Sequence, residues 1–382
     1  MRARLAGEAL TKPRLLFFAT EDWFVRSHFL PLVRRARAEG YDVAVLARSS
    51  GALAGESGVR VIDAPFARGS MQPWDLARQV AHLRELLARE RPDIVHAIAL
   101  KPSALLALSG YREGGRVLAV TGRGYLGVRR TMWTQVVNQE LRSALRRALL
   151  QPRTLLLVEN KADRDWLSRN GDLDAKTMIM PGAGVNPDAY TPAPEPTAGP
   201  IVVGVVARLI WTKGVDLAVA AVHRLRTQGE DIVLRIAGEA DPESPEAVSA
   251  AEVERWRGLE GVEVLGRMED VSAFWAGAHI ACLPSRGGEG LPRSLLEAAA
   301  CARPIVTSDA PGCGDFVTDE MGLVTPRENV PALAGALHRL AHDAGARASM
   351  GAAARAKVVA AHTEEHAAAV AAEAWRRLMV GA

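Results

Sequence analysis

The chain of 382 residues is poor in the features that mark several common protein classes. Its three cysteines, Cys282, Cys301 and Cys313, show no CxxC spacing and have no histidine cluster nearby. This favours buried thiols in a reducing cytosol over disulfides or a structural zinc site. No stretch approaches 18 uncharged apolar residues, so we expect no transmembrane helix. The first 13 residues lack the continuous apolar core of a signal peptide and are expected to form a loose tail.

An excess of charge of one sign is also missing. The chain has 47 Lys and Arg against 44 Asp and Glu, a formal net charge of +3, so nothing indicates nucleic acid as a partner. A hydrophobic content of 48% is ordinary for a soluble globular protein, and the length is sufficient for two domains with sizeable cores.

Short apolar runs alternate with longer amphipathic ones, which is typical of βα repeats around a parallel sheet. The fold class is therefore α/β. In the first half we expect strands over 15–19, 43–47, 59–64, 94–99, 117–120, 155–158 and 178–180, and helices over 27–39, 74–90, 131–149 and 161–169. In the second half we expect strands over 201–206, 233–237, 262–265, 280–283, 305–307 and 323–325, followed by an Ala-rich helix over 363–379.

A Pro-rich stretch over 181–200 separates the two halves. It contains Pro187, Pro192, Pro194 and Pro196 between its ends and shows no helical period, so we interpret it as a linker or domain boundary.

The segment from Pro284 to Glu297 carries the most functional information. Glu289 stands in a Gly-rich loop, and Glu297 stands eight positions later in the Ala-rich helix that follows. Such a loop offers backbone amides and the positive end of a helix dipole to an anion. At about 1.5 Å of rise per residue, the two carboxylates would bracket roughly 12 Å along the helix axis, which suits an extended ligand such as a sugar nucleotide.

Two cations form a second motif about 80 residues earlier. Arg208 and Lys213 follow the apolar run over 201–206, which includes Gly204, and they open the next helix. Arg offers a planar fork to phosphate and Lys a point charge. In open α/β sheets, ligands bind beyond the carboxyl ends of the strands, and Arg208, Gly266 and Glu289 each follow a predicted strand.

Together these residues resemble glycosyltransferase family 4, the retaining sugar-nucleotide transferases of GT-B fold. The Glu-x7-Glu element and the upstream Arg and Lys all match the family pattern, and the flanks over 299–306 and 309–313 fit as well. The resemblance implies two facing Rossmann-like domains with parallel sheets. Residues 1–195 would form the acceptor domain, with a C-terminal helix over about 363–382 packing back onto it, and residues 196–362 the donor domain.

The resemblance also implies roles. Arg208 and Lys213 would hold the donor diphosphate, Glu289 would lie near the donor sugar or the anomeric centre, and Glu297 would accept hydrogen bonds from the ribose hydroxyls. The remaining residues expected to bind the nucleotide sugar are Gly290, Leu291, Gly266, Arg267 and Gly204. Glu289 could instead be a first-turn acid favoured by the helix dipole, and the cations a surface pair.

A subgroup that extends polyprenyl-diphosphate-linked sugars is the most similar part of the family. Its pattern matches at His28, at His96 and Lys101, and at Thr121-Gly122-Arg123. These are the candidates for contacts with acceptor or phosphate. Many family 4 members carry a histidine near the Thr-Gly pattern and this chain does not, so a histidine-assisted step there is not expected.

Two further segments allow alternative interpretations. The basic region from Arg129 to Arg153 suits either an anionic membrane surface or ordinary packing on the sheet. Asp172-Leu173-Asp174 matches the Asp-x-Asp metal motif of another transferase fold, but its place after a helix and a glycine favours a turn. We therefore expect no metal cofactor.

The sequence thus predicts a cytoplasmic glycosyltransferase, peripheral to the membrane, with a UDP-sugar donor (UDP-N-acetylhexosamine being one candidate) and a lipid-linked or small-molecule glycan acceptor. The alternatives are a transferase with a soluble acceptor, a sugar-nucleotide epimerase of the same fold, and a non-catalytic sugar-nucleotide-binding subunit.

Overall fold

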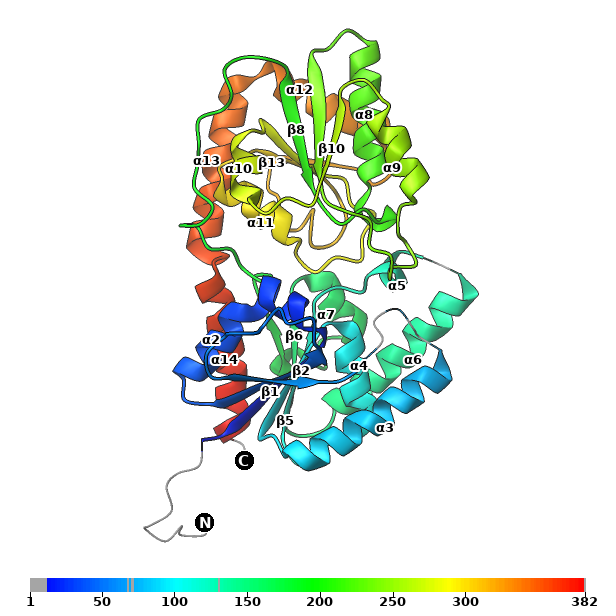
Figure 1. Ribbon diagram of the computed structural model, residues 1–382, viewed down its shortest axis with the longest axis vertical. Helices are drawn as coiled ribbons and strands as arrows, with labels where there is room; N and C mark the ends of the chain where they lie inside the picture. Colours follow the sequence, from blue (N-terminus) through cyan, green and yellow to red (C-terminus); the bar gives the residue numbers. More distant parts are fainter. Residues whose placement is uncertain (1–11, 67–68, 70–71, 130, 381–382) are drawn as a thin grey trace. The chain divides into compact units, whose positions relative to one another are not determined.

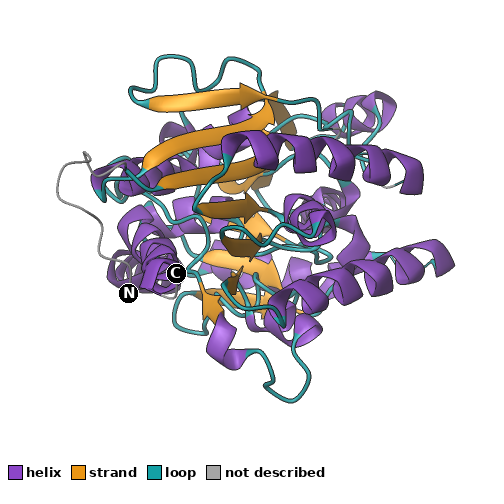
Figure 2. Ribbon diagram, turned by 90° about the horizontal axis from the view of Figure 1, so that it is seen from below, coloured by secondary structure: helices purple, strands orange, loops and turns teal. Residues whose placement is uncertain are grey.

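The computed structural model describes residues 12–66, 69, 72–129 and 131–380, arranged around two sheets with helices on both faces (Figures 1 and 2). Most of the predicted amino-terminal tail lies outside the described residues. Within the described ranges, no helix is long and apolar enough to cross a membrane.

The first sheet has the strand order β3-β2-β1-β4-β5-β6-β7. Its strands are β1 (Arg14–Glu21), β2 (Asp42–Arg48), β3 (Val59–Asp63), β4 (Ile94–Ile98), β5 (Gly115–Val120), β6 (Thr154–Val158) and β7 (Thr177–Ile179). The helical elements of this part of the chain are α1 (Asp22–Phe24), η1 (Val25–Phe29), α2 (Leu30–Ala38), α3 (Pro73–Glu90), α4 (Leu100–Ser109), α5 (Tyr125–Val128), α6 (Met132–Leu149), α7 (Lys161–Leu167) and η2 (Asp174–Lys176).

The second sheet repeats the scheme with the order β10-β9-β8-β11-β12-β13, and all its strand pairs are parallel. Its strands are β8 (Ile201–Val206), β9 (Ile232–Ala237), β10 (Val262–Gly266), β11 (Ile280–Leu283), β12 (Ile305–Ser308) and β13 (Gly322–Thr325). Its helical elements are η3 (Trp211–Lys213), α8 (Val215–Thr227), α9 (Ala250–Arg257), α10 (Val271–Ala276), α11 (Arg293–Ala300), α12 (Val330–His342) and α13 (Ala344–Ala361), and the chain continues into α14 (Glu364–Val380).

Alternating side chains of the second sheet build two separate cores. Val202 of β8 packs with α10, α11 and α13, whereas Val203 and Val205 pack with α8 and α12. A strand directs successive side chains to opposite faces, so a run of β-branched residues that is apolar throughout requires helices on both sides. This explains why the strands of the second half read as continuous hydrophobic runs.

The predicted helix over 27–39 is not one regular helix. It is divided into the π-helical segment η1 and α2, with α1 preceding them outside the predicted range, and α2 has Pro31 in its first turn. Proline has no N–H to donate to the preceding turn, which favours a local widening of the helix. The helix α4 was not predicted, because its apolar run has little amphipathic period.

The described residues form two compact units. Unit 1 lies within Met1–Ala119, Ser143–Leu157 and Ala368–Ala382, and unit 2 within Val120–Arg142 and Val158–Ala367. The units are defined by packing, and the division at residues 195 and 196 into acceptor and donor domains stays a prediction.

Candidate active site

The crevice of unit 2 is set by the strand order of the second sheet. The order reverses between the adjacent strands β8 and β11, and ligands of such sheets bind beyond the carboxyl ends of the strands at that point. The segment after β8 carries Arg208 and Lys213, and the segment after β11 carries Glu289. The topology therefore brings together the two motifs that stand about 80 residues apart in the sequence.

Lys213 and Glu289 are in direct contact. The Lys213 Nζ atom lies 2.8 Å from Oε2 of Glu289, and the two side chains are only 12% and 17% exposed. The cation and the carboxylate predicted to act together thus form one largely desolvated pair. Glu289 precedes α11, which begins at Arg293, so the spacing of about 12 Å predicted from helical rise does not apply.

Arg286 holds the two loops of this pair together. Its guanidinium donates to both carboxylate oxygens of Asp216, at 2.8 and 2.7 Å, and to the carbonyl of Trp211 at 2.6 Å. Its backbone N–H donates to the carbonyl of Thr212 at 2.8 Å. The bidentate geometry fixes the loop after β11 against η3, and so it fixes Glu289 relative to Lys213.

Glycines allow the closest approaches within this site. Gly214 has φ +70°, and a Cβ atom there would lie 2.0 Å from the carbonyl oxygen of Pro284. A Cβ on Gly312 would lie 1.6 Å from the carbonyl oxygen of Gly290. Any side chain at either position would displace the loop that carries Glu289.

Arg208 lies on the rim of the same crevice. Its Nη1 atom donates to Oδ2 of Asp241 at 2.7 Å, and its side chain is 51% exposed. An exposed guanidinium retains donors for an incoming phosphate while its carboxylate partner orients it.

Glu297 is buried in α11 and has two hydrogen-bond donors. The Tyr190 hydroxyl and Nε of Arg293 each donate to its Oε1 at 3.0 Å. Burial raises the pKa of Glu297, and Arg293 opposes that shift. The cost of burying this carboxylate is thus met by one cation and one hydroxyl, both of which contact Oε1.

The other predicted nucleotide-binding residues occupy different environments. Gly266 ends β10 with φ +71°, and the exposed Arg267 follows it. Gly290 and Leu291 belong to the Glu289 loop. Gly204, in contrast, lies inside β8, where a Cβ atom would meet the side chains of Phe274, Trp275 and Ala278. The prediction that Gly204 lies against the ligand is wrong. Gly204 lies inside β8, and its lack of a side chain leaves room for the apolar side chains of α10 and of the turn after it.

A set of residues after β6 also contacts the Glu289 loop, and sequence reasoning missed it. Oε2 of Glu159 accepts from the backbone N–H of Leu291 at 2.8 Å. Nδ2 of Asn160 donates to the carbonyls of Glu289 and Gly290 at 3.0 and 3.1 Å. One amide predicted to be open to an anion, that of Leu291, is therefore bonded to a carboxylate. These residues also follow a buried strand, so the strand-end rule applied to the other candidates would have found them.

Two carboxyl groups in the segment after β6 have strongly raised pKa values. Burial raises the pKa of Glu159 to about 8, and the charges of Asp163 and Glu289 add to the shift. Burial also raises the pKa of Asp163 to about 6, although Arg123 donates to its Oδ1 at 2.9 Å. Perturbed carboxyl groups beside a reactive loop are typical of functional sites.

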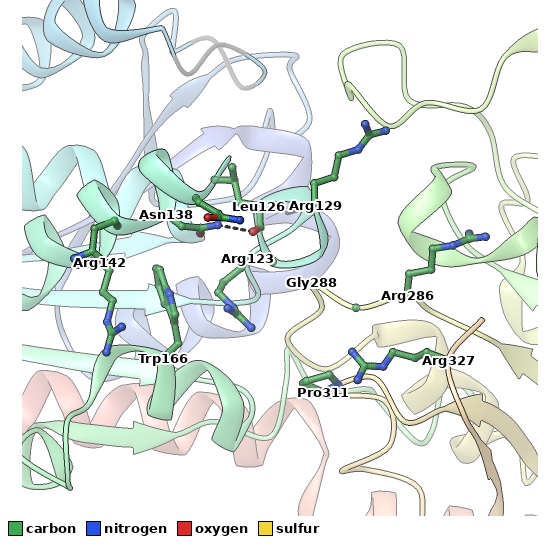
Figure 3. Close-up of a pocket in the computed structure, with 14 residues that line it drawn as sticks. Arg123, Leu126, Arg129, Asn138, Arg142, Trp166, Arg286, Gly288, Pro311 and Arg327 are labelled. Atoms are coloured by element: carbon green, nitrogen blue, oxygen red, sulfur yellow. Dashed lines mark hydrogen bonds between the residues drawn. The ribbon is translucent and has the colours of Figure 1, made fainter. Parts of the chain in front are cut away.

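An arginine-lined pocket of about 380 Å³ opens beside the same loop (Figure 3). None of its 14 described lining residues is acidic, and five are arginines: Arg123, Arg129, Arg142, Arg286 and Arg327. Four of these pair with carboxylates outside the lining, as Arg129 does with Glu246 and Arg327 with Asp309. Nε of Arg142 is buried and has no hydrogen-bond partner among the described residues. The pocket therefore favours an anionic ligand.

Thr121, Gly122 and Arg123 follow β5 and border this region. A Cβ on Gly122, which has φ +105°, would lie 2.6 Å from the carbonyl oxygen of Gly288. The N–H of Gly124 donates to that carbonyl at 2.8 Å. Arg123 also lies 5.5 Å over the ring of Trp166, which orients its guanidinium toward the pocket.

In unit 1, two of the predicted acceptor residues follow the strands at which the order of the first sheet reverses. His28 lies in η1 after β1, bonded to Ser27 Oγ at 2.7 Å and stacked on Phe24. Lys101 lies in the first turn of α4 after β4, and burial lowers its pKa to about 8. Ala99, between β4 and α4, has φ +80°, a strained conformation for a residue with a side chain.

His96 does not lie at the strand end where it was expected. It is 1% exposed inside β4, its Nδ1 accepts from Nε1 of Trp375 at 3.1 Å, and Phe17 stacks beside it. Burial lowers its pKa to about 3, so it is a neutral core residue. The alternation along β4 directs it into the packing of α14, away from any ligand at the strand end.

Asp172 lies in a turn, as predicted, and its Oδ1 accepts from the backbone N–H of Arg169 at 2.7 Å. This carboxylate stabilises the turn.

Comparison with solved structures defines the class of protein. Sucrose-phosphate synthase from Thermosynechococcus elongatus superposes with a TM-score of 0.79 at 18% identity, over 97% of this chain and 100% of that one. The Anabaena protein HepE, solved with UDP, gives a TM-score of 0.71 at 18% identity, over 96% and 100%. The fold is GT-B, as predicted.

Sequence comparison defines the family. The model described as Glycosyltransferase Family 4 matches residues 25–189, and that described as Glycosyl transferases group 1 matches residues 200–343. A Corynebacterium glutamicum GDP-mannose-dependent monoacylated alpha-(1-6)-phosphatidylinositol monomannoside mannosyltransferase is 31% identical over 73% of this chain and 75% of its own length. A Campylobacter jejuni N,N'-diacetylbacillosaminyl-diphospho-undecaprenol alpha-1,3-N-acetylgalactosaminyltransferase is 24% identical over 75% and 77%. The chain belongs to glycosyltransferase family 4 and is a glycosyltransferase.

Proposed function

We propose that this enzyme transfers a sugar from a UDP-sugar to a hydroxyl of a sugar carried on polyprenyl diphosphate, with retention of the anomeric configuration. The observation that carries the proposal is the arginine-lined pocket beside Gly287 and Gly288, adjacent to the loop of the Lys213–Glu289 pair. A diphosphate-bearing acceptor bound there would have its sugar end near the reacting centre. Four of the five guanidinium groups have carboxylate partners, and a neutral sugar acceptor would leave the buried Nε of Arg142 without an anion to bind.

The donor is assigned to the crevice between β8 and β11. Lys213 and Arg208 hold the donor diphosphate and stabilise the charge that develops on it as it leaves. Glu297 accepts from the ribose hydroxyls, and Gly266 and Arg267 border the base. Glu289 positions the donor sugar, and its contact with Lys213 aligns both side chains before the donor binds.

The transfer proceeds on one face of the sugar. The bond from the anomeric carbon to the diphosphate oxygen breaks, and the acceptor oxygen forms its new bond on the same side. The acceptor proton passes to the leaving phosphate oxygen, so no protein base is required on the opposite face. The protein's part is to hold the two phosphates and the acceptor hydroxyl in this geometry.

A GDP-mannose donor is the second candidate. It is favoured by the name of the Corynebacterium relative, which is 31% identical. UDP is favoured by the resemblance to the subgroup that extends polyprenyl-linked sugars. The name of the Campylobacter relative supports the diphospho-undecaprenol-linked acceptor and names no nucleotide. A soluble small-molecule acceptor is the alternative that the pocket charge disfavours.

The surface of α6 supports a peripheral place at the cytoplasmic face of the membrane. Met132, Trp133 and Val136 are 86%, 49% and 57% exposed in its first two turns. Arg129 precedes them, and Arg146 and Arg147 lie in the last turn. Exposed apolar side chains combined with basic ones suit the interface of an anionic bilayer.

The test is a transfer assay with defined substrates. The protein is incubated with UDP-sugars or GDP-mannose, and with either a polyprenyl-diphosphate sugar or the same sugar free in solution. We expect transfer from a UDP-sugar to the lipid-linked acceptor only, with the donor's anomeric configuration in the product as measured by NMR. Arg142→Ala should raise the acceptor KM by about tenfold or more, because a charge-assisted bond is worth roughly 1.5–3 kcal/mol.

Arg164→Ala is the matched control, since Arg164 pairs with the exposed Asp165 on α7 and neither lines the pocket nor belongs to the surface of α6. Equal acceptor KM values for the two variants would remove the pocket from the proposal. If the free sugar has a KM similar to that of the lipid-linked sugar, the soluble acceptor is favoured. If GDP-mannose is the only donor used, it replaces the UDP-sugar in the proposal.

A further inference from the structure

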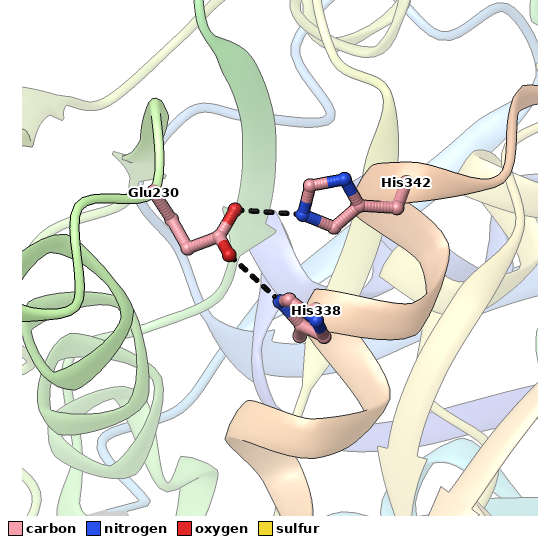
Figure 4. Close-up of side chains that lie close together, drawn as sticks. All are labelled: Glu230, His338 and His342. Atoms are coloured by element: carbon pink, nitrogen blue, oxygen red, sulfur yellow. Dashed lines mark hydrogen bonds and ion pairs between the residues drawn. The ribbon is translucent and has the colours of Figure 1, made fainter.

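A cluster of three side chains in unit 2 lies outside the residues assigned to transfer. Nδ1 of His338 is 3.0 Å from Oε1 of Glu230, and Nε2 of His342 is 2.8 Å from Oε2 of the same carboxylate (Figure 4). One potential ligand atom from each of the three residues lies within 4.8 Å of the others. Both imidazoles thus point at a single carboxylate (Figure 4).

The backbone holds the three residues in place from two directions. His338 and His342 are one turn apart on α12, so they share a helix face, and their ring centroids are 4.6 Å apart. Leu337 and Leu340 of the same helix are fully buried in the core that also contains Leu225 of α8. Packing therefore fixes the position and rotation of α12.

Glu230 stands in the tight turn between α8 and β9. Its N–H donates to the carbonyl of Leu225, and its carbonyl accepts from the N–H of Ile232 at 3.1 Å. Gly229 provides the positive φ of +91° that the turn requires. The carboxylate is presented from a fixed backbone and is 22% exposed, less than either histidine.

The ligand types and the size of the cluster suit a transition-metal cation. Two imidazoles and one carboxylate form a set that binds Zn²⁺, with bonds of about 2.0–2.2 Å. Ligand atoms around a tetrahedral ion at that radius lie about 3.3 Å apart. The contacts of 3.0 and 2.8 Å are somewhat shorter than this spacing, and the separations within the set are at most 4.8 Å, so the rings must rotate to bring all three atoms to the ion. Both histidine side chains are more than half exposed, which permits that rotation.

Binding exchanges a proton for the metal. In the present contacts Nε2 of His342 donates its N–H to Glu230, and Nδ1 of His338 lies 3.0 Å from the other carboxylate oxygen. Zn²⁺ would take the place of the bridging proton, and a neutral ring would keep its proton on the opposite nitrogen. The carboxylate would supply the negative charge, and the fourth position would be open to water.

We propose that Glu230, His338 and His342 form a Zn²⁺ site that ties the last turn of α12 to the turn after α8. The proposal is independent of the function proposed above, because none of the three residues contacts the Lys213–Glu289 pair or lines the arginine pocket. Its consequence is a metal-dependent stability of unit 2 and no requirement for the ion in sugar transfer.

The test is a titration of the full chain, first treated with a chelator, with Zn²⁺ alone by calorimetry and with Co²⁺ by visible absorption. We expect one equivalent to bind and the Co²⁺ spectrum to show tetrahedral or five-coordinate bands. His342→Ala and Glu230→Gln should each weaken Zn²⁺ binding by at least about tenfold, because three ligands become two.

His223→Ala is the matched control, since His223 is an exposed histidine on α8 that does not belong to the cluster. Its affinity for Zn²⁺ should equal that of the wild type. Thermal unfolding provides a second readout, with a Zn²⁺-dependent rise in Tm that a chelator reverses in the wild type and in His223→Ala only.

The proposal is overturned if neither Zn²⁺ nor Co²⁺ binds. The cluster would then consist only of two histidine–carboxylate contacts at the end of α12. It is also overturned if the cluster variants and His223→Ala lose affinity equally. The exposure of His338 and His342, 52% and 61%, means that the variants should fold, and circular dichroism checks this.

Discussion

The two sheets share one strand order but use the carboxyl ends of their strands differently. In both, the order reverses between two adjacent strands, β1 and β4 in the first sheet and β8 and β11 in the second. At the reversal point of the second sheet, opposite charges from two loops are in contact, as Lys213 is with Glu289. At the carboxyl edge of the first sheet, Asp22 binds backbone and hydroxyl groups of the loop after β2, and the charge pair beside it is that of Glu21 with Arg48.

Asp22 illustrates the contacts made at the carboxyl edge of the first sheet, which we call the first edge. It is fully buried, Oδ1 accepts from the N–H of Ser50 at 2.9 Å, and Oδ2 accepts from the N–H of Ala52 at 3.1 Å. The adjacent Glu21 pairs with Arg48. These contacts hold the loop after β2 in place, which leaves His28 and Lys101 as the candidates for ligand contacts.

The comparison teaches that topology determines where a ligand can bind, while the pairing of charges indicates what is bound. A strand end whose carboxylates bind its own loops is structural. At the corresponding edge of the second sheet, a lysine from one loop contacts a carboxylate from another, and the half-exposed Arg208 in the same crevice retains donors for phosphate.

The largest effect should come from Lys213→Ala. Loss of a group that stabilises the leaving diphosphate should lower kcat by about 10²–10³, because such donors act mainly on the transition state. Asp22→Asn, at the other edge, should lower Tm and leave the nucleotide-induced change in Tm intact. Steady-state transfer assays and thermal unfolding measure the two effects. Similar losses of kcat in both variants would contradict the difference between the edges.

Arg286→Ala should destabilise unit 2 by about 2 kcal/mol, which corresponds to a fall in Tm of about 4–8 °C. The variant leaves Asp216 without its bidentate partner and frees the loop of Glu289. Arg257→Ala on α9 removes an exposed pair with Glu254 and should change Tm by no more than about 2 °C. Equal values of Tm would show that the loop is held by packing alone.

Lys101 provides a test that depends on pH. Because burial lowers its pKa to about 8, its charge is present at pH 7 and is lost as the pH rises toward 9. If Lys101 binds acceptor phosphate, the acceptor KM should rise by up to about tenfold between pH 7 and 9 in the wild type. In Lys101→Arg, which stays charged, the rise should be absent. Parallel pH profiles for the two proteins would exclude Lys101 from the acceptor site.

Glu159→Gln should change stability in a way that depends on pH. The pKa of Glu159 is raised to about 8 in the fold, so the folded state retains a proton that the unfolded chain loses above about 4.5. Stability contributed by the protonated group therefore declines from about pH 4.5 to pH 8. The neutral glutamine does not titrate, so its Tm should exceed that of the wild type by an amount that grows over this range. A Tm difference that does not change with pH would show that Glu159 is ionised throughout.

Much of this arrangement could be predicted because it depends on local patterns. Continuous apolar runs indicated all strands of both sheets, and the strand-end rule indicated Arg208, Lys213 and Glu289. The division of 27–39 between η1 and α2 was not predicted, although Pro31 stands where α2 begins. The roles of Gly204 and His96 as packing residues depend on side chains from α10 and α14, which no local pattern reveals.

The contacts that orient the site were also beyond local reasoning. Arg286 and Asp216 stand 70 positions apart, and Asn160 stands 129 positions from Glu289. Charged residues of these kinds are common in any soluble chain, so only their positions in the fold distinguish them. Asn160 has the sequence signature of a helix N-cap, and the structure confirms that Asp163 N–H donates to its side chain at 2.8 Å.

The central claim is that the edge between β8 and β11 binds the nucleotide of the donor. The most direct measurement is thermal unfolding of the wild type, Glu297→Ala and the surface control Glu254→Ala with UDP, GDP, ADP and their sugars. A ligand at 100 times its Kd should stabilise by about 2.7 kcal/mol, a rise in Tm of about 5–10 °C. We predict this rise with UDP compounds for the wild type and Glu254→Ala, and its loss in Glu297→Ala. No rise with any nucleotide, or an equal rise in all three proteins, would contradict the account.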